Sequence, residues 1–521
     1  MRPTFCRALG SVALLLTAVP AAAGPLALVG DVQLRQDVDL LKAAGLIDGP
    51  VDSWPLPWAQ IDAGIDRAHD GRELDPYLKS AVSRLDRLGR LASKGVVVDA
   101  RVSGTNNVSV ARDFGTLARA KGDASASVEF NTDVVSVKLG GGLRTDQDGD
   151  AYNFEPSQAV VRLGNWAVYG GYTEQWFGPG QDGALLFSNS ARPFPKIGIK
   201  RLMPDAIDFP VLRWLGPIRL DLFAGVMDED RDFRNTVVVG TRLSFAPGRR
   251  WEIGLNRAQQ LCGDGRPCGF SQILNSFIGF GNADNSTVGD TQAFLNQPGN
   301  QIAGFDISYT HRFGPVAAKF YVEAEAEDFD NVILEQYMRM IGTSVSGPWG
   351  SKGAVWTAKL EYSDTYATSL FNGTPLESLT GGQTRYPASA YNNVLYYTGF
   401  TYKNLPIGHW TDGDSRNLMF AGTLTDTRNR RWYASLRSVH LNVTNTGNPP
   451  WVVGGPGLPT HPISYRVSAN SETFAILTAG AEVPTAYGDL RVEARYQTDS
   501  PNTPERREGR AAVEMSLRQR F

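Results

Sequence analysis

Beyond its first 23 residues, this 521-residue chain has no long hydrophobic run. A transmembrane helix needs about 20 consecutive apolar residues, and no later stretch approaches that length. This absence excludes a helical membrane protein. It does not exclude a membrane β-barrel, because barrel strands alternate lipid-facing and lumen-facing residues and keep an average hydropathy near that of a soluble protein.

An excess of charge of one sign is also missing, and histidine is scarce. The net charge is −3 with 20% charged residues, so the composition indicates no nucleic-acid partner. None of the five histidines lies in a G-x-S-x-G or H-E-x-x-H context. We therefore expect no enzyme activity, no cofactor and no metal site. A hydrolase remains an alternative only if the fold brings a serine and a histidine into contact.

The first 23 residues have the pattern of a secretory signal peptide. Arg2 and Arg7 form a positively charged start, the apolar stretch VALLLTAV follows, and residues 21–23 are small alanines suited to signal peptidase. The apolar stretch is too short to span a bilayer. We predict that residues 1–23 are removed and that the mature protein is exported.

Cysteine is almost absent from the mature chain. Cys6 lies in the predicted signal peptide, which leaves Cys262 and Cys268 in the stretch LCGDGRPCGF. In an oxidising compartment this spacing favours a disulfide that closes a small loop. Such a ring would contribute roughly 2 kcal/mol in the chain-entropy model. A metal site is the alternative, but no histidine neighbours the pair.

From about residue 30 to 95 the apolar residues recur at helical spacing. Helices are predicted within residues 31–47, 53–68 and 74–95. The third segment carries an apolar stripe formed by Leu78, Val82, Leu85, Leu88 and Leu91. Three helices of this size can form a small bundle, so we assign residues 24–95 to an N-terminal α-helical bundle.

From Val96 to the C-terminus the apolar period changes to two. The stretch TVVVGTRLSF places Val237, Val239, Leu243 and Phe245 on one face, and a short turn follows. Another hairpin carries Lys319 and glutamates opposite its apolar face. This pattern is typical of strands with lipid outside and water inside. A soluble antiparallel sheet shows the same alternation, but export and the number of strands favour a barrel.

The end of the chain supports the same interpretation. It reads AAVEMSLRQRF, with Phe521 last and Leu517, Met515 and Val513 at alternate positions. A terminal aromatic on an amphipathic strand resembles the insertion signal of bacterial outer-membrane proteins. Gln519 departs from that pattern, because an aromatic or apolar residue is more usual there. We predict that residues 96–521 form an all-β transmembrane barrel, in which roughly 24 residues per strand and connection give about 16–18 antiparallel strands.

Several polar stretches contain aromatic residues that suit sugar binding. Rings stack on the CH-rich faces of sugars, while amides, Arg and Asp satisfy the hydroxyls. We predict outer loops near residues 262–303, 327–353, 372–390 and 442–462. Our candidate carbohydrate-binding residues are Trp176, Arg192, Trp349, Tyr386 and Trp451. For any single Trp, the aromatic girdle that barrels carry at the membrane interface is an equal alternative.

The stretch WFGPGQDGALLFSNSARPFPKIGIKR, residues 176–201, interrupts the strand pattern. One strand is predicted to end near Tyr172 and another to begin near Lys196, so the stretch is a loop at the barrel rim or one folded inward. Its prolines and glycines favour tight turns. Arg192 is expected to pair with lumen carboxylates or, as the alternative, to contact an acidic sugar.

Four stretches together resemble the Wzi family of capsule-assembly outer-membrane proteins. They are DVQLRQDVDLLKAAGLIDGPVDSWPLPWAQI, the loop just described, GTRLSFAPGRRWEIGLNRAQQLCGDGRPC and NQPGNQIAGFDISYTHRF. The resemblance covers nearly the entire mature chain and implies an eighteen-stranded barrel with a periplasmic helical bundle. It implies a lectin that holds exported capsular polysaccharide at the cell surface and is not an enzyme. The outer loops do not match residue by residue, so it implies no particular glycan.

A porin or polysaccharide-export channel of the same size is the alternative function. Polar strand faces that carry Lys319, Glu323, Arg491, Glu493 and Arg495 are compatible with a hydrated lumen. For either function we expect a location in the bacterial outer membrane. The expected partners are capsular or extracellular polysaccharide and outer-membrane lipid, with the polysaccharide export machinery as a further candidate, and a monomer is expected.

Overall fold

The computed structural model describes residues 26–521 apart from 72, 116, 146–150, 211, 229, 272, 275–298, 331–332, 381–384, 386, 394, 446–451, 454–460, 463–464 and 504–508. The predicted signal peptide therefore lies outside the described residues. Two of the candidate sugar-binding residues, Tyr386 and Trp451, also lie outside them.

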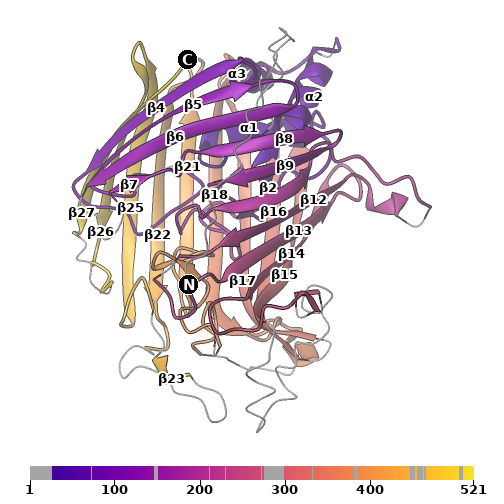
Figure 1. Ribbon diagram of the computed structural model, residues 1–521. Helices are drawn as coiled ribbons and strands as arrows, with labels where there is room; N and C mark the ends of the chain where they lie inside the picture. Colours follow the sequence, from indigo (N-terminus) through magenta and orange to yellow (C-terminus); the bar gives the residue numbers. More distant parts are fainter. Residues whose placement is uncertain are drawn as a thin grey trace, which may run out of the picture.

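Eighteen antiparallel strands form a closed barrel (Figure 1). The barrel segments are β4 (Val96–Thr105), β5 (Gly122–Asn131), β6 (Val135–Thr145), β7 (Tyr152–Asn153), β8 (Gln158–Leu163), β9 (Trp166–Gly171), β11 (Lys196–Arg201), β12 (Ile218–Val226), β13 (Val237–Phe245), β14 (Trp251–Leu261), β15 (Gly299–Phe313), β16 (Val316–Asp330), β17 (Ile333–Trp349), β18 (Ala354–Thr368), β21 (Arg416–Thr425), β22 (Arg431–Leu441), β25 (Glu472–Thr485), β26 (Gly488–Gln497) and β27 (Ala511–Arg520). Segments β7 and β8 both pair with β6 and share one strand position. Pairing of β27 with β4 closes the barrel, as the all-β barrel prediction requires.

The remaining elements are short and are not part of the barrel wall. The helices are α1 (Val32–Ala43), α2 (Trp58–His69) and α3 (Pro76–Ala92), and the 3₁₀ turns are η1 (Arg213–Leu215) and η2 (Glu377–Thr380). The two-residue strands are β1 (Leu26–Ala27), β2 (Ser53–Trp54), β3 (Leu56–Pro57), β10 (Trp176–Phe177), β19 (Thr401–Tyr402), β20 (Leu405–Pro406), β23 (Val452–Val453) and β24 (His461–Pro462). No helix in the described part of the chain is long and apolar enough to cross a membrane.

The three helices gather at one end of the barrel, together with the C-terminus (Figure 1). The side chain of Asp31 caps α1 by accepting a hydrogen bond from the backbone N–H of Leu34 at 2.9 Å. The connections 246–250, 314–315 and 350–353 are short turns at this same end. Because outer-membrane barrels have short periplasmic turns and longer outer loops, we call this the periplasmic end and the opposite one the outer end.

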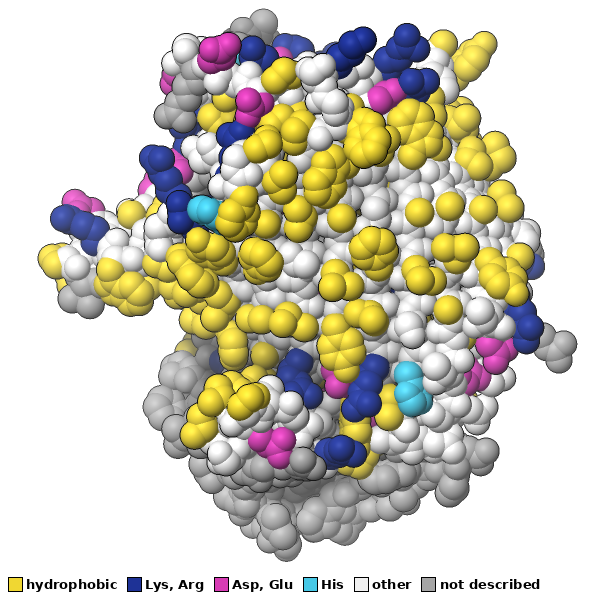
Figure 2. Space-filling model, turned by 180° about the vertical axis from the view of Figure 1, so that it is seen from behind, with side chains coloured by type: hydrophobic (Ala, Val, Ile, Leu, Met, Phe, Trp, Pro, Cys, Tyr) yellow, Lys and Arg dark blue, Asp and Glu magenta, His cyan; other side chains and the backbone are white. Residues whose placement is uncertain are grey.

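The barrel wall is apolar outside and polar inside, as the period of two predicted. On β27, Val513 and Met515 are 54% and 52% exposed, while the alternating Glu514 is buried. Hydrophobic side chains gather in a band across the wall, and charged side chains lie mainly above and below it (Figure 2). A band of this kind faces the hydrocarbon of a membrane, and the buried polar side chains face the lumen.

The predicted outer loop at residues 327–353 is wrong. Strand β16 continues to Asp330 and β17 begins at Ile333, so most of the stretch is a long hairpin. The turn that follows, at residues 350–353, is short and lies at the periplasmic end. Polar residues near the tip of the hairpin resemble a loop in sequence, but continued pairing satisfies their backbone groups.

Candidate functional site: the filled lumen and the outer loops

The lumen is occupied by segments of the chain itself. Residues 44–57 of the helical head enter from the periplasmic end, and residues 106–115, 172–195 and 395–415 fold inward from the outer end. Most of their buried apolar side chains belong to two large clusters with lumen-facing side chains of the wall, and a smaller cluster forms around Trp410. The barrel therefore has a packed interior.

The helical head and the inward loop at residues 172–195 are joined by direct backbone pairing. Strand β10 pairs antiparallel with β2, which places Trp176 opposite Trp54. Phe114 stands edge-on to both indoles, with ring centroids 5.2 Å apart in each case. Arg35 of α1 lies over the Phe114 ring at 4.5 Å and donates a hydrogen bond to the carbonyl of Pro179 at 2.9 Å. These contacts join three distant parts of the sequence at the centre of the lumen.

Buried carboxylates on the wall hold the backbone of the loop at residues 172–195. Glu361 accepts hydrogen bonds from the backbone N–H groups of Gln181 at 2.5 Å and Asp182 at 3.0 Å. Glu323 accepts one from the N–H of Leu185 at 2.7 Å. A loop without secondary structure needs such partners, because unpaired buried N–H groups are costly. The loop is thus built into the architecture of the barrel, which settles its position as inward.

Asp182 on this loop forms a buried ion pair with the wall. Arg437 of β22 donates through Nε at 2.8 Å and approaches through Nη2 at 2.6 Å, and Asn417 donates at 2.8 Å. Burial alone would raise the pKa of the Asp182 carboxyl, but the Arg437 guanidinium outweighs it and the pKa is lowered. The loop therefore carries a charge that only the wall neutralises.

The helical head is held to the wall in a similar way. Lys319 of β16 forms an ion pair with Asp52 and another with Asp39 at 3.1 Å. Glu252 of β14 accepts hydrogen bonds from the backbone N–H groups of Val51 at 2.7 Å and Asp52 at 2.9 Å. The head is consequently a plug with lumen contacts, rather than a cap beside the periplasmic mouth.

The third inward segment carries a buried histidine. His409 is fully buried; its Nδ1 lies 2.8 Å from the hydroxyl of Thr411, and no described group pairs with its Nε2. Burial lowers the pKa of His409 to about 4, because a charged ring would lose its hydration there.

We expect the free energy of unfolding to fall as pH drops from about 6.5 to about 4, since the unfolded chain binds a proton on His409 in this window and the folded chain does not. The loss from His409 alone is roughly 3 kcal/mol. Urea titrations of the folded barrel at a series of pH values measure it. His409→Gln should flatten the profile relative to wild type, and an unchanged profile in that variant would contradict the assignment.

Several cavities remain among the described side chains of the lumen, and one that is partly open lies beside the start of α1. It has a volume of about 250 Å³, and side chains of both charge signs line it, among them Asp99, Arg101, Lys138, Arg144, Glu155 and Arg518. Ligand pockets usually measure roughly 300–1,000 Å³, so this space is small for a sugar ligand. A lumen packed in this way opposes the alternative function of a porin or export channel.

The three candidate sugar-binding residues that the structure describes lie in different parts of the barrel. Trp176 has no exposed surface and belongs to the lumen core, a position that favours a packing role. Trp349 is 62% exposed but lies at the periplasmic end of β17, where it fits the aromatic girdle and not an outer loop. Arg192 is buried in the inward loop, within electrostatic range of Glu155.

The sequence did not indicate a cluster of aromatic side chains that the structure forms among the outer loops. Phe233 lies edge-on to Tyr396, with centroids 5.7 Å apart, and its ring centroid is 5.9 Å from that of Tyr397. Arg266 lies over the rings of Phe233 and Tyr396 at 5.7 and 5.4 Å. We call Phe233, Arg266, Tyr396 and Tyr397 the outer aromatic patch. Phe233 and Tyr397 are partly exposed.

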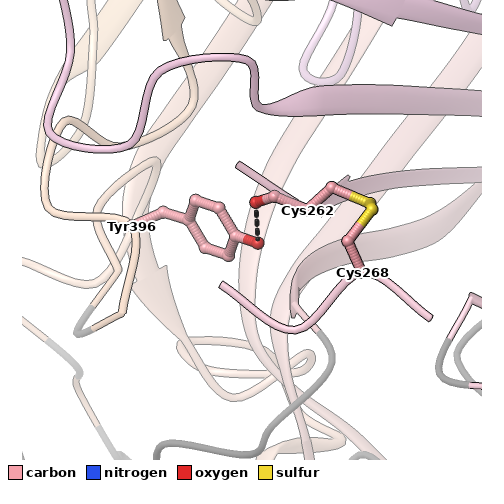
Figure 3. The surroundings of a disulfide bond; sticks show 3 residues. All are labelled: Cys262, Cys268 and Tyr396. Carbon is pink, nitrogen blue, oxygen red and sulfur yellow. Dashed lines mark hydrogen bonds between the residues drawn. A yellow bond between two sulfur atoms is a disulfide. The ribbon is translucent and has the colours of Figure 1, made fainter. Parts of the chain in front are cut away.

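A disulfide fixes one edge of this patch. Cys262 and Cys268 are joined in the structure, and Arg266 lies between them in the sequence. The hydroxyl of Tyr396 donates a hydrogen bond to the carbonyl of Cys262 at 2.9 Å (Figure 3). The only sequence signal for the patch was the small ring of the disulfide, because the other members come from other loops: Phe233 precedes β14, and Tyr396 and Tyr397 lie more than a hundred residues further along the chain.

The geometry needed for hydrolysis is incomplete in the described residues. Nε2 of His440 lies 3.1 Å from the hydroxyl of Ser471, at the outer end of β22 and β25. Within the described part of the chain, no carboxylate hydrogen-bonds the other ring nitrogen, as the orienting group of a catalytic triad would. Across the same residues, no group of three or more His, Cys, Asp or Glu side chains is placed to hold a metal ion.

Comparison with known proteins finds one family over most of the chain. The family model described as capsule assembly protein Wzi matches residues 97–513. A curated relative, an uncharacterized 55.8 kDa protein in the cps region of Klebsiella pneumoniae, is 27% identical over 340 residues. The match spans 63% of this chain and 63% of that relative's length, which is less than two thirds.

Solved structures show a similar fold. Wzi of Escherichia coli, described as an outer-membrane, carbohydrate-binding β-barrel involved in group 1 capsule assembly, has a TM-score of 0.75 at 20% identity. The alignment covers 95% of this chain and 99% of that one. The outer-membrane protein OprD of Pseudomonas aeruginosa has a TM-score of 0.42 at 7% identity over 82% of this chain and 94% of its own, which supports no inference.

Proposed function

Because the chain belongs to the family of the capsule assembly protein Wzi, we propose that it binds capsular or extracellular polysaccharide at its outer end and retains it on the cell surface. The observation that carries this proposal is the filled lumen. A polymer cannot pass a barrel whose interior is packed by the head and by inward loops, so contact with polymer is left to the outer loops.

The outer aromatic patch is the described surface that best fits such a contact. Phe233 and Tyr397 offer partly exposed rings to the CH side of a sugar, and the Arg266 guanidinium adds a positive charge beside them. The disulfide and the Tyr396 hydrogen bond hold these rings in place before binding. A prearranged site loses less conformational freedom when the sugar binds.

Weak individual contacts are sufficient for retention. A polysaccharide repeats the same unit, and many copies of the protein lie in one membrane. Once one copy has bound, neighbouring repeats face other copies at a high effective concentration, so the total attachment exceeds the affinity of a single site. This mechanism requires no catalysis and no conformational change in the barrel.

Purified protein and capsular polysaccharide from the host bacterium test the proposal in a direct binding assay. We expect Phe233→Ala and Tyr397→Ala each to weaken binding by roughly 5- to 30-fold, because each removes a stacking ring from the patch.

Trp349→Ala is the matched control, since it removes an exposed aromatic ring at the opposite, periplasmic end. It should bind polysaccharide like wild type. Equal affinity in wild type and both patch variants would remove the patch from the proposal, and no binding by wild type would refute the function itself. Contact with the export machinery and a monomeric state stay predictions of the sequence.

A further inference from the structure

One connection at the periplasmic end is much longer than its neighbours. Residues 202–217 join β11 to β12 and project sideways from the barrel wall, at the right of Figure 1 and the left of Figure 2. The next turn at this end, residues 246–250, is short. The projection adds no strand to the closed sheet.

The described tip of this projection is apolar and exposed. Ile207 and Leu212 are 38% and 36% exposed, Phe209 is 53% exposed, and Trp214 is 65% exposed. Large apolar side chains grouped on one protruding segment are uncommon on surfaces that face water, and they usually mark an interaction surface.

The backbone of the projection satisfies much of its own hydrogen bonding. The N–H groups of Leu212 and Arg213 both donate to the carbonyl of Phe209 at 2.9 Å, and that of Leu215 donates to Leu212 at 3.0 Å. A bridge between Ala206 and Pro217 closes the base. Internal pairing of this kind is what an environment poor in water requires.

Its charges are also suited to the boundary between lipid and water. Asp208 and Arg213 form an ion pair with each other while both side chains remain exposed. In water such a pair contributes little to stability. At the headgroup level of a membrane the paired charges can stay near the polar surface, and the stem of Arg213 can extend along the apolar boundary.

The projection is continuous with the lipid-facing wall. The ring of Trp214 lies edge-on to Phe245, with centroids 6.5 Å apart. Phe245 ends β13 at the periplasmic end, on the face that points outward. Trp251, which begins the next strand, is 45% exposed at the same level. Trp and Tyr at this level are typical of the interface of membrane barrels.

We propose that residues 205–215 form an interfacial anchor, whose apolar side chains insert among the phospholipids of the periplasmic leaflet beside β11–β13. The partner is a lipid surface, because the apolar tip extends an established lipid interface outward from the wall. The anchor fixes the depth and tilt of the barrel on one side, as an amphipathic segment does when its apolar face lies in the headgroup and acyl boundary.

A single-cysteine probe tests this in the complete protein. Cys262 and Cys268 are joined in a disulfide, so a cysteine introduced by Phe209→Cys can be labelled selectively with a polarity-sensitive dye. The matched control is Arg249→Cys, in the short turn at the same end, where the native side chain is 76% exposed. Both labelled proteins are inserted into phosphatidylethanolamine and phosphatidylglycerol vesicles with nitroxide-labelled phospholipid, and heat-modifiable gel mobility confirms folding.

The anchor predicts blue-shifted emission at position 209 and quenching by nitroxide lipid roughly threefold stronger than at position 249. Equal quenching of both positions by aqueous iodide, with little by nitroxide lipid, would overturn it. Protection of position 209 from both quenchers would also overturn it, since a protein surface, from a second copy or another partner, would then cover the segment.

Discussion

Arg437→Met is expected to lower the free energy of unfolding by about 3–5 kcal/mol, because it leaves the carboxylate of Asp182 buried without its cation. Asp182 has no exposed surface, and Arg437 is its closest cationic partner at 2.6 Å. Asn417 still donates one hydrogen bond, but a neutral amide does not compensate a full negative charge. Urea titration of the folded barrel in lipid measures the loss.

Arg430→Met is the matched control for this prediction. Arg430 pairs with Asp426 in a periplasmic turn next to β22, and its side chain is 39% exposed. An exposed pair contributes at most about 1 kcal/mol. The double variant Arg437→Met/Asp182→Leu should recover part of the loss, because it removes both buried charges. If Arg437→Met costs no more than Arg430→Met, the ion pair does not hold the inward loop.

Trp176→Ala is expected to destabilise the barrel by about 3–5 kcal/mol, the usual cost of truncating a fully buried aromatic side chain. The indole packs edge-on against Phe114 and lies opposite Trp54, so its removal leaves a cavity where head and loop meet. Thermal or urea unfolding in lipid gives the value. Trp349→Ala at the exposed periplasmic end should cost roughly 1 kcal/mol or less.

Trp176→Phe distinguishes packing from sugar contact. Phenylalanine keeps most of the buried ring and should fold, with a smaller loss of stability than the alanine variant. Because Trp176 has no exposed surface, we expect this variant to bind polysaccharide with the affinity of wild type. A folded Trp176→Phe protein that no longer binds polymer would show that the ring reaches the sugar after all.

Local patterns in the sequence were sufficient for the barrel and for the helices of the head. Alternation of apolar and polar residues depends only on neighbours along the chain, and it gave the lipid face of β13 and β27 correctly. The apolar stripe of residues 74–95 likewise appears as α3. These signals are strong because each strand or helix must present one face to lipid or to a core.

The inward loops could not be placed in the same way. Glycine, proline and asparagine favour turns both in water and in a filled lumen, so the composition of residues 176–195 does not distinguish the two. What keeps the loop inside is a set of contacts remote in sequence, such as Glu361 with the backbone of Gln181. No local pattern predicts that pairing.

The sequence prediction that Trp349 lies in an outer loop is wrong for a related reason. Its surroundings, GPWGSKG, read as a polar outer loop, but the end of the barrel at which a turn lies depends on how many strands precede it. If residues 327–353 were one outer loop, Trp349 would lie at the outer end. Because the stretch contains the strand β17, the chain returns to the periplasmic end before Trp349. Once β16 and β17 are recognised as one long hairpin, the turn after Trp349 belongs to the periplasmic end.

We propose that this protein retains polysaccharide at the cell surface without transporting or cleaving it. The most direct test is to delete its gene in the host bacterium and measure capsular polysaccharide separately in washed cells and in the medium. The proposed function predicts unchanged total polymer, with most of it released into the medium and returned to the cells by the wild-type gene. Unchanged cell-bound polymer in the deletion strain would contradict it.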